Sequence, residues 1–119
     1  MKLKEKRDSL IKEVEEARKI LKAHFKEELK NYEFTIPTQQ ELLEYGKIRI
    51  YVDFSGLSCR EEEISCAYCR IKDLIPFNRV KELFISIWQE AANEIFEDGE
   101  ITYTSHDNSS VTFYIEIKE

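Results

Sequence analysis

The chain has no lysine or arginine between Glu82 and Ile117, a stretch that holds eight acidic residues. The first thirty residues have the opposite balance, with ten bases against seven acids, and the whole chain carries a net charge of −6. Charge asymmetry of this kind bears on partners and association rather than on fold. Because it lacks a basic stripe, we expect neither direct binding to nucleic acid through its phosphates nor binding to an anionic membrane surface.

Other absences narrow the class of protein further. Only three glycines and two prolines occur in 119 residues, which is enough chain for one core but leaves little room for long loops. No apolar run approaches the roughly 18 residues of a membrane-spanning helix, and the charged N-terminus lacks the hydrophobic stretch of a secretory signal. An odd number of cysteines, three, suits a reducing compartment. We therefore expect a single domain over residues 1–119, located in the cytoplasm.

Residues 3–32 are predicted to form one long amphipathic helix. Apolar residues recur at heptad spacing from Leu10 to Leu21, and the stripe then shifts to Phe25. Thirty residues rising 1.5 Å each span about 45 Å, whereas a domain of this size is roughly 35 Å across. The helix must either kink or extend beyond its domain and pack on another chain. For the second case we expect homodimer contacts from Leu3, Leu10, Val14 and Ala17.

The remaining patterns predict an α+β fold in the order α-α-β-β-α-β-β, with an antiparallel sheet of about four strands packed by helices. Thr38 and Glu41 form a capping box that opens a short helix over residues 39–44, closed by a left-handed Gly46. Alternating apolar residues predict a strand at about residues 48–54. A second, less regular strand is expected at residues 64–71.

The last third of the sequence predicts a helix followed by a hairpin. Asn78 is the expected N-cap of a third helix, which has a wide apolar stripe and ends at Gly99. Strands at residues 101–104 and 111–117 then form the closing hairpin.

Three cysteines and a histidine are candidate zinc ligands. Cys66 and Cys69 have the two-residue gap with which two thiolates can hold one zinc ion, Cys59 lies seven residues earlier, and His106 in the hairpin loop could complete the set. However, residues three apart on a strand point to opposite faces, and free cysteine is often buried as a small hydrophobe. Packing is the favoured interpretation, and a zinc-binding module is the alternative.

Catalysis has little support in the sequence. Cys59 is followed by Arg60, but the three glutamates after it disfavour a thiolate. His24 has the carboxylate of Glu28 one helical turn away, which is typical of a packed histidine. We therefore expect no enzymatic activity and no cofactor apart from the zinc of the alternative above.

Five acids at the end of the third predicted helix are the candidate partner-binding residues. Most of them lie at the negative end of the helix dipole, where lysine or arginine would be more stable. This unfavourable placement suggests that they meet a basic partner. Mimicry of DNA is less favoured, because an i, i+4 pair is separated by about 6 Å while phosphates repeat every ~3.4 Å. The expected contacts are Glu90, Glu94, Glu97, Asp98 and Glu100.

The outward face of the sheet offers a third kind of site. Aromatic residues interleaved with arginine on an open sheet can stack RNA bases, and protein interfaces favour the same residues. The net charge favours a protein. The residues expected there are Arg49, Tyr51 and Tyr114, with Tyr68 and Arg70 sharing one face of the second strand.

Together these features predict a small acidic intracellular protein that binds another protein, as an inhibitor or regulator. In size and charge it is similar to phage-encoded inhibitors of host or defence enzymes, anti-CRISPR proteins among them, and to bacterial toxin-immunity proteins. The expected partner is a basic protein surface, such as that of a nucleic-acid-processing enzyme. The alternatives are the zinc-binding module and a nucleic-acid-binding module that uses the Tyr/Arg sheet face.

Overall fold

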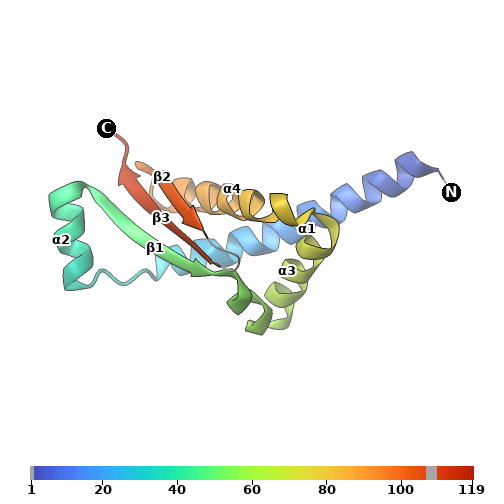
Figure 1. The fold of residues 1–119 in the computed structure, drawn as a ribbon, viewed down its shortest axis with the longest axis horizontal. Helices are drawn as coiled ribbons and strands as arrows, with labels where there is room; N and C mark the ends of the chain where they lie inside the picture. Colours follow the sequence, from blue (N-terminus) through green and yellow to red (C-terminus); the bar gives the residue numbers. More distant parts are fainter. Residues whose placement is uncertain (1, 107–109) are drawn as a thin grey trace.

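The computed structural model describes residues 2–106 and 110–119, which form four α-helices and one three-stranded antiparallel sheet (Figure 1). The strand order is β1-β3-β2. The α+β class is confirmed, but the sheet has three strands rather than about four. The elements are α1 (Leu3–Lys30), α2 (Ile36–Tyr45), β1 (Lys47–Asp53), the 3₁₀ helix η1 (Phe54–Cys59), α3 (Glu62–Leu74), α4 (Phe77–Ile95), β2 (Gly99–His106) and β3 (Ser110–Ile117).

Helix α1 runs unbroken for 28 residues, so the predicted long helix extends beyond the domain rather than kinking. Its N-terminal part projects past the other elements (Figure 1), and the molecule is 58 Å long but only 30 Å and 24 Å across. The contact expected between His24 and Glu28 is confirmed, with 3.1 Å between Nε2 and Oε1.

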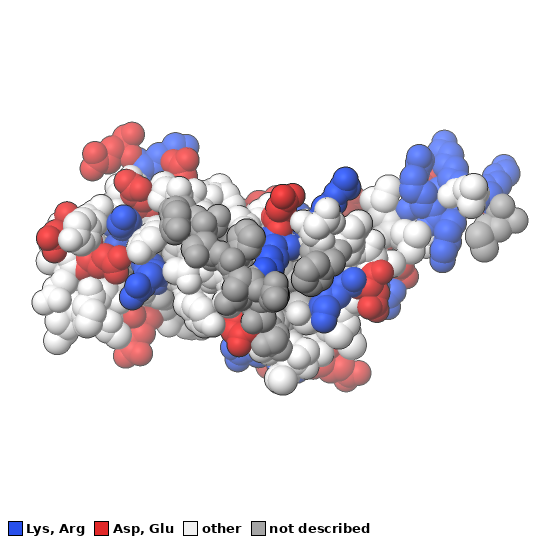
Figure 2. All heavy atoms as spheres, viewed as in Figure 1, with Lys and Arg blue, Asp and Glu red and all other residues white. Residues whose placement is uncertain are grey.

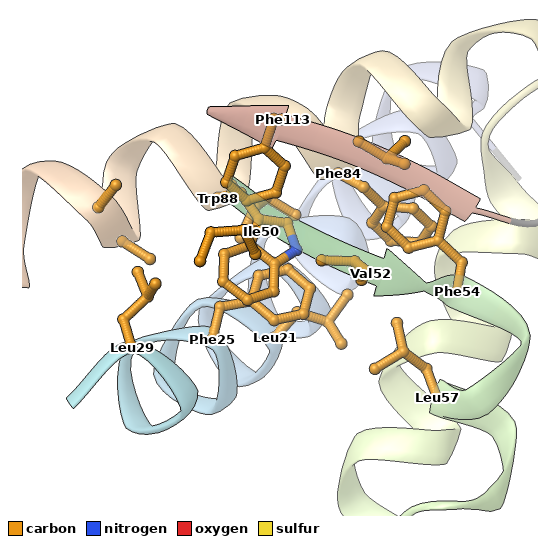
Figure 3. Packing of buried hydrophobic residues seen from close by; sticks show 14 of the residues in the cluster. Leu21, Phe25, Leu29, Ile50, Val52, Phe54, Leu57, Phe84, Trp88 and Phe113 are labelled. Carbon is orange, nitrogen blue, oxygen red and sulfur yellow. The ribbon is translucent and has the colours of Figure 1, made fainter. Parts of the chain in front are cut away.

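The core lies between the sheet and the two long helices, α1 and α4 (Figure 3). The alternation predicted for β1 is confirmed, because Ile48, Ile50 and Val52 are buried while the residues between them face outward. Strand β3 pairs with both neighbours, and its Phe113 lies opposite Ile50. Phe25 of α1 stacks on Trp88 of α4, with ring centroids 4.2 Å apart. These contacts fasten the C-terminal half of α1 to the domain.

The strand predicted at residues 64–71 is wrong, because these residues belong to helix α3. Ala67, Tyr68 and Ile71 are its buried residues, and this spacing follows one face of a helix. Glu62 and Glu63 occupy the first turn, where acids are favourable to the helix dipole. The β-branched and aromatic residues of this segment, Ile64, Tyr68 and Ile71, also suit a strand when taken alone. Because this segment is a helix, the sheet has three strands.

Two predicted helix starts are also wrong by a few residues. Helix α2 is capped by Thr35, whose Oγ1 accepts a 3.4 Å hydrogen bond from the backbone nitrogen of Thr38, so the predicted capping box is not used. A proline in the first turn favours this earlier start. Helix α4 begins after Pro76, two residues before the expected Asn78 cap. Gly46 does end α2 in the left-handed conformation, with φ of 67°.

Strands β2 and β3 form the predicted closing hairpin. Both strands are longer than predicted, and residues 107–109 of the expected loop lie outside the described residues. In the part of the chain that the structure describes, no helix has both the length and the apolar character needed to cross a membrane.

Candidate protein-binding surface

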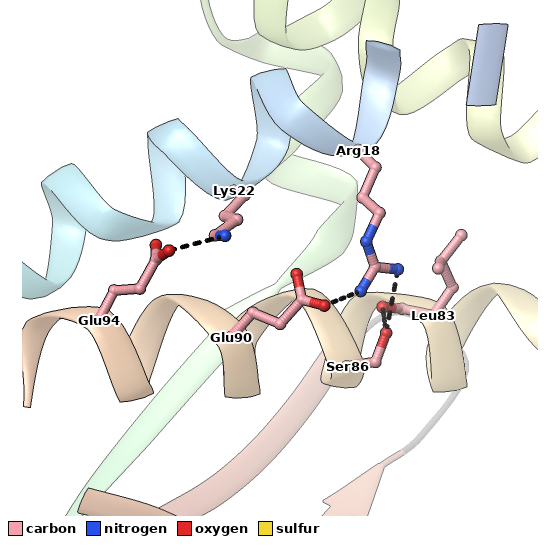
Figure 4. Close-up of polar contacts among 6 residues, drawn as sticks. All are labelled: Arg18, Lys22, Leu83, Ser86, Glu90 and Glu94. Atoms are coloured by element: carbon pink, nitrogen blue, oxygen red, sulfur yellow. Dashed lines mark hydrogen bonds and ion pairs between the residues drawn. The ribbon is translucent and has the colours of Figure 1, made fainter. Parts of the chain in front are cut away.

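Two of the five candidate acids, Glu90 and Glu94, are engaged by helix α1 (Figure 4). Arg18 Nη2 lies 2.6 Å from Glu90 Oε1. Lys22 Nζ lies 2.9 Å from one carboxylate oxygen of Glu94, and Lys26 Nζ lies 3.3 Å from the other. The polar edges of α1 and α4 are therefore cross-linked by a row of ion pairs beside the apolar core.

This row of ion pairs accounts for part of the charge asymmetry of the sequence, because it pairs bases of α1 with acids of α4. Basic residues in the C-terminal half of α1 lie against the acids in the C-terminal half of α4, so part of the opposite charge is matched within the chain. The hydrogen bond from Lys22 is the largest influence on Glu94 and lowers its pKa below the ordinary value of 4.5. Burial opposes this shift, and the hydrogen bond from Lys26 adds to the lowering. The unfavourable position of this acid near the end of α4 is compensated by two cations.

The other three candidate acids differ in their surroundings. Glu97 and Asp98 lie in the turn after α4, and Glu100 lies in β2. All three are exposed, and within the described residues their carboxylates have no hydrogen-bond or ion-pair partner. The turn is held through its backbone, because the Lys118 N–H donates to the Asp98 carbonyl at 2.6 Å. The backbone of this turn is thus held to the chain just after β3, while the three carboxylates have no matching cation among the described residues.

Beside them, a groove of about 190 Å³ lies between α2 and the sheet. Phe34 and Ile117 leave 41% and 42% of their surface exposed there. We call this groove, together with Glu97 and Glu100, the acidic groove. It is lined by Phe34, Leu42, Ile48, Phe96, Asp98, Gly99, Ile115, Glu116 and Ile117.

Gly99 holds the acidic groove in shape. A Cβ at this position would lie 2.8 Å from Ile115 Cγ2 and 3.0 Å from Phe96 Cβ, so the backbone approaches closely only because the residue is glycine. The Gly99 N–H also donates to the Phe96 carbonyl at 2.9 Å. This close approach sets Asp98 and Glu100, on either side of the glycine, against the end of the sheet.

Sequence reasoning missed the apolar part of this surface. One signal was present, since Leu42 and Leu43 are consecutive in a short helix and cannot both face the same neighbour. Leu42 lines the groove while Leu43 is 88% exposed. Helix α2 has no buried residue, and Ile36 and Tyr45 are 72% and 60% exposed. The acidic groove therefore adjoins a helix with unusually many exposed apolar side chains.

The candidate zinc ligands do not form a described metal site. Cys59 ends η1, while Cys66 and Cys69 lie on α3, and all three thiols are free and exposed. Because α3 is a helix, the opposite-face argument does not apply, and the two helical cysteines lie on one side. The side chain of His106 lies outside the described residues. Among those that are described, no three His, Cys, Asp or Glu residues are grouped so that they could hold a metal ion.

The sheet face contains part of the predicted Tyr/Arg set. Arg49 and Tyr51 face outward from β1, and Tyr51 is 66% exposed. Tyr114 lies opposite Arg49 in β3, and the Lys47 ammonium lies 4.5 Å from the centroid of its ring. The other two predicted members belong to α3 instead of the sheet. Tyr68 is buried in the core, and Arg70 pairs with Glu13 of α1 at 2.8 Å.

The four candidate dimerisation residues differ in burial. Ala17 is buried in the core of its own chain and is not available to a partner. Leu10 and Val14 are partly buried, and Leu3 is 84% exposed on the projecting part of α1.

Comparison with protein-family models, curated proteins and solved structures gave no match to this chain.

Proposed function

We propose that this chain is a non-enzymatic binding protein, an inhibitor or regulator, that captures a basic protein surface through the acidic groove. The observation that carries the proposal is a set of three exposed carboxylates beside an apolar groove, none of which has a hydrogen-bond or ion-pair partner among the described residues. Glu90 and Glu94, which the charge pattern also favoured as contacts, are assigned here to holding α1 against α4.

The size of the groove favours a protein partner over a small molecule. A volume of about 190 Å³ is below the ~300–1,000 Å³ of typical small-molecule sites. It has room for one apolar side chain inserted from a partner's surface. Buried anchors of this kind carry much of the energy of protein interfaces, and surrounding charges give specificity and speed of association. The complementary ligand is a protein segment with an exposed apolar residue flanked by lysine or arginine.

The test reverses the charge of the acidic groove. The triple variant Glu97→Lys, Asp98→Lys, Glu100→Lys is immobilised beside the wild type, and the proteins that each retains from a lysate are quantified by mass spectrometry. We expect the wild type to enrich a specific basic protein and the variant to retain it at least tenfold less, a loss of about 1.4 kcal/mol or more. Circular dichroism confirms that the variant is folded.

A matched control makes the same change in net charge elsewhere. Glu61→Lys, Asp73→Lys, Glu82→Lys alters three exposed acids on α3, its N-terminal cap and the first half of α4, away from α2 and the C-terminus (Figure 1). This variant is expected to retain the partner as well as the wild type does. If both triple variants retain the partner as well as the wild type does, the assignment of the acidic groove is refuted. If both lose the partner to the same extent, capture depends on net charge alone.

A second function, binding of single-stranded RNA, is favoured by one observation on the sheet. Lys47, Arg49, Tyr51 and Tyr114 share its outward face, and Lys47 already lies over an aromatic ring. The same face carries Asp53 and Glu116, which reduces its attraction for phosphates. Salt-dependent retention of the protein on single-stranded RNA, abolished by Arg49→Ala with Tyr51→Ala, would support this function over the first.

A further inference from the structure

The projecting end of α1 forms one wall of a second groove, which is unrelated to the acidic groove. We call residues 3–14 the overhang and this groove the overhang groove. It has a volume of about 500 Å³ and six apolar residues in its lining. Leu3 and Ile11 are 84% and 48% exposed there. The full lining is Leu3, Lys6, Arg7, Leu10, Ile11, Val14, Glu15, Leu74 and Ile75.

The apolar stripe of the overhang continues the stripe that buries the other half of α1. Ala17 and Leu21 lie in the core. In the overhang, Leu10 and Leu3 lie seven and fourteen residues before Ala17, and Val14 lies seven residues before Leu21. Residues seven apart lie on nearly the same side of a helix. The overhang therefore presents the same face that elsewhere packs on the domain, and in the overhang groove this face lies beside Leu74 and Ile75.

Charge is arranged in opposite blocks along the overhang groove. Residues 2–12 contain five bases and two acids, whereas residues 13–16 contain three acids and no base. Figure 2 shows lysines and arginines gathered at the tip of α1. In the groove itself, Lys6 and Arg7 line one end and Glu15 lines the other.

We propose that the overhang groove binds the overhang of a second copy of this chain, with the two helices antiparallel. A two-fold axis near the middle of the overhang sets Lys6 and Arg7 of each copy against Glu15 of the other, so every charge match occurs twice. Twelve apolar side chains are then shared between the copies. A parallel arrangement would oppose like charges along the whole contact and align the two helix dipoles unfavourably.

This antiparallel dimer leaves the acidic groove free. The acidic groove lies at the end of the molecule that carries α2 and the C-terminus, whereas the overhang projects from the opposite end (Figure 1). The dimer would present two copies of the acidic groove, one at each end of a long particle. Two sites on one particle raise the apparent affinity for a partner that has two matching surfaces.

The first experiment measures mass in solution by light scattering across a range of protein concentrations. We expect the wild type at twice its 14.2 kDa. Leu10→Glu with Val14→Glu is expected to raise the dimer dissociation constant at least tenfold. Its circular dichroism should stay native, because the overhang lies outside the core. The matched control, Ser9→Glu with Ala23→Glu, adds the same charge at exposed positions of α1 outside the overhang groove and should leave the dimer intact.

A charge swap then tests the antiparallel direction. Glu15→Lys alone, or Lys6→Glu with Arg7→Glu, places like charges in contact and is expected to weaken the dimer. The triple variant that combines all three changes exchanges the blocks and should restore the affinity of the wild type. In a parallel dimer each of these residues would face the same residue of the other copy. Combining the three changes would then not restore the dimer affinity that Glu15→Lys, or Lys6→Glu with Arg7→Glu, had lost.

Three outcomes would overturn the proposal. The first is a wild type that remains monomeric at high concentration. If such a monomer bound vesicles of anionic lipid, the overhang would be a membrane contact and not a dimer contact. The second is a dimer that persists in Leu10→Glu with Val14→Glu, which would place the interface elsewhere. The third is failure of the triple swap to restore dimerisation.

Discussion

The two halves of α1 have the same kind of sequence and opposite surroundings. Between Ala17 and Leu29 the apolar stripe is buried, with Leu21 and Phe25 fully enclosed. Between Leu3 and Val14 the stripe continues at the same spacing, but Leu10 and Val14 are only partly buried and Leu3 is 84% exposed. Periodicity identifies which face of a helix is apolar. It does not identify the neighbour that covers this face, which depends on where the rest of the domain ends.

The largest expected effect comes from the buried half. Leu21 is completely enclosed, and Leu21→Ala removes its buried methyl groups and leaves a cavity among the core side chains. We expect the free energy of unfolding to fall by about 2–5 kcal/mol. Urea denaturation followed by circular dichroism measures this change. A loss below 1 kcal/mol would mean that α1 is not anchored in the core as described.

The acids at the C-terminal end of α4 and in the turn after it show a similar division between matched and unmatched groups. Glu94 pairs with two lysines of α1, whereas Glu97, three residues later, has no ion-pair partner among the described residues. In the sequence both acids lie at the same end of a helix and look alike. The charge pattern predicted that some of these acids act in recognition, but only the packing of α1 on α4 distinguishes the structural acids from the candidate contacts.

A smaller effect is expected from Glu94→Gln, and it depends on pH. The folded state lowers the pKa of Glu94 below 4.5, so the ionised carboxylate stabilises the fold above the pKa of the unfolded chain. This contribution is lost as the pH falls through the lower pKa of the folded state. The wild type should therefore lose more thermal stability between pH 6 and pH 3 than Glu94→Gln does. The difference is small because the pair is exposed to solvent.

Glu97→Gln is the matched control for this experiment. It makes the same substitution at the same end of α4, in a residue without an ion-pair partner in the described part of the chain. Its melting temperature should follow the wild type from pH 6 to pH 3. If Glu94→Gln also follows the wild type throughout, the lysines of α1 do not contribute to stability through this carboxylate.

Much of the fold could be predicted from the sequence because its patterns are long or clean. The heptad spacing gave α1, the strict alternation gave β1, and the wide stripe around Trp88 gave α4. The strand predicted from Ile64 to Ile71 was wrong because a short apolar run fits a strand and a helix almost equally well. The predicted start of α2 was wrong because Thr35 and Thr38 are equally good caps in isolation. The proline between them favours the earlier start at Thr35.

The candidate site was predictable only in part, for a different physical reason. The unmatched acids Glu97, Asp98 and Glu100 belong to one short segment and are visible in the sequence. The apolar half of the acidic groove combines Phe34 and Leu42, which lie just before and in α2, with Ile117 near the other end of the sequence. Only the pairing of β1 with β3 brings these parts together, and no local pattern encodes that meeting.

The smallest expected effect returns to α1 and sharpens the comparison of its halves. Leu3→Ala is the same substitution as Leu21→Ala, in the same helix and on the same stripe, but the side chain is 84% exposed. Alanine is a slightly better helix former than leucine and little apolar surface is lost from burial, so the free energy of unfolding should change by less than about 0.5 kcal/mol. The measurement is made at low protein concentration, where association contributes least to stability. A loss above 1 kcal/mol there would mean that the overhang packs on its own domain, and the two halves of α1 would no longer differ. A loss that appears only as the concentration rises would assign the contact of Leu3 to a second copy.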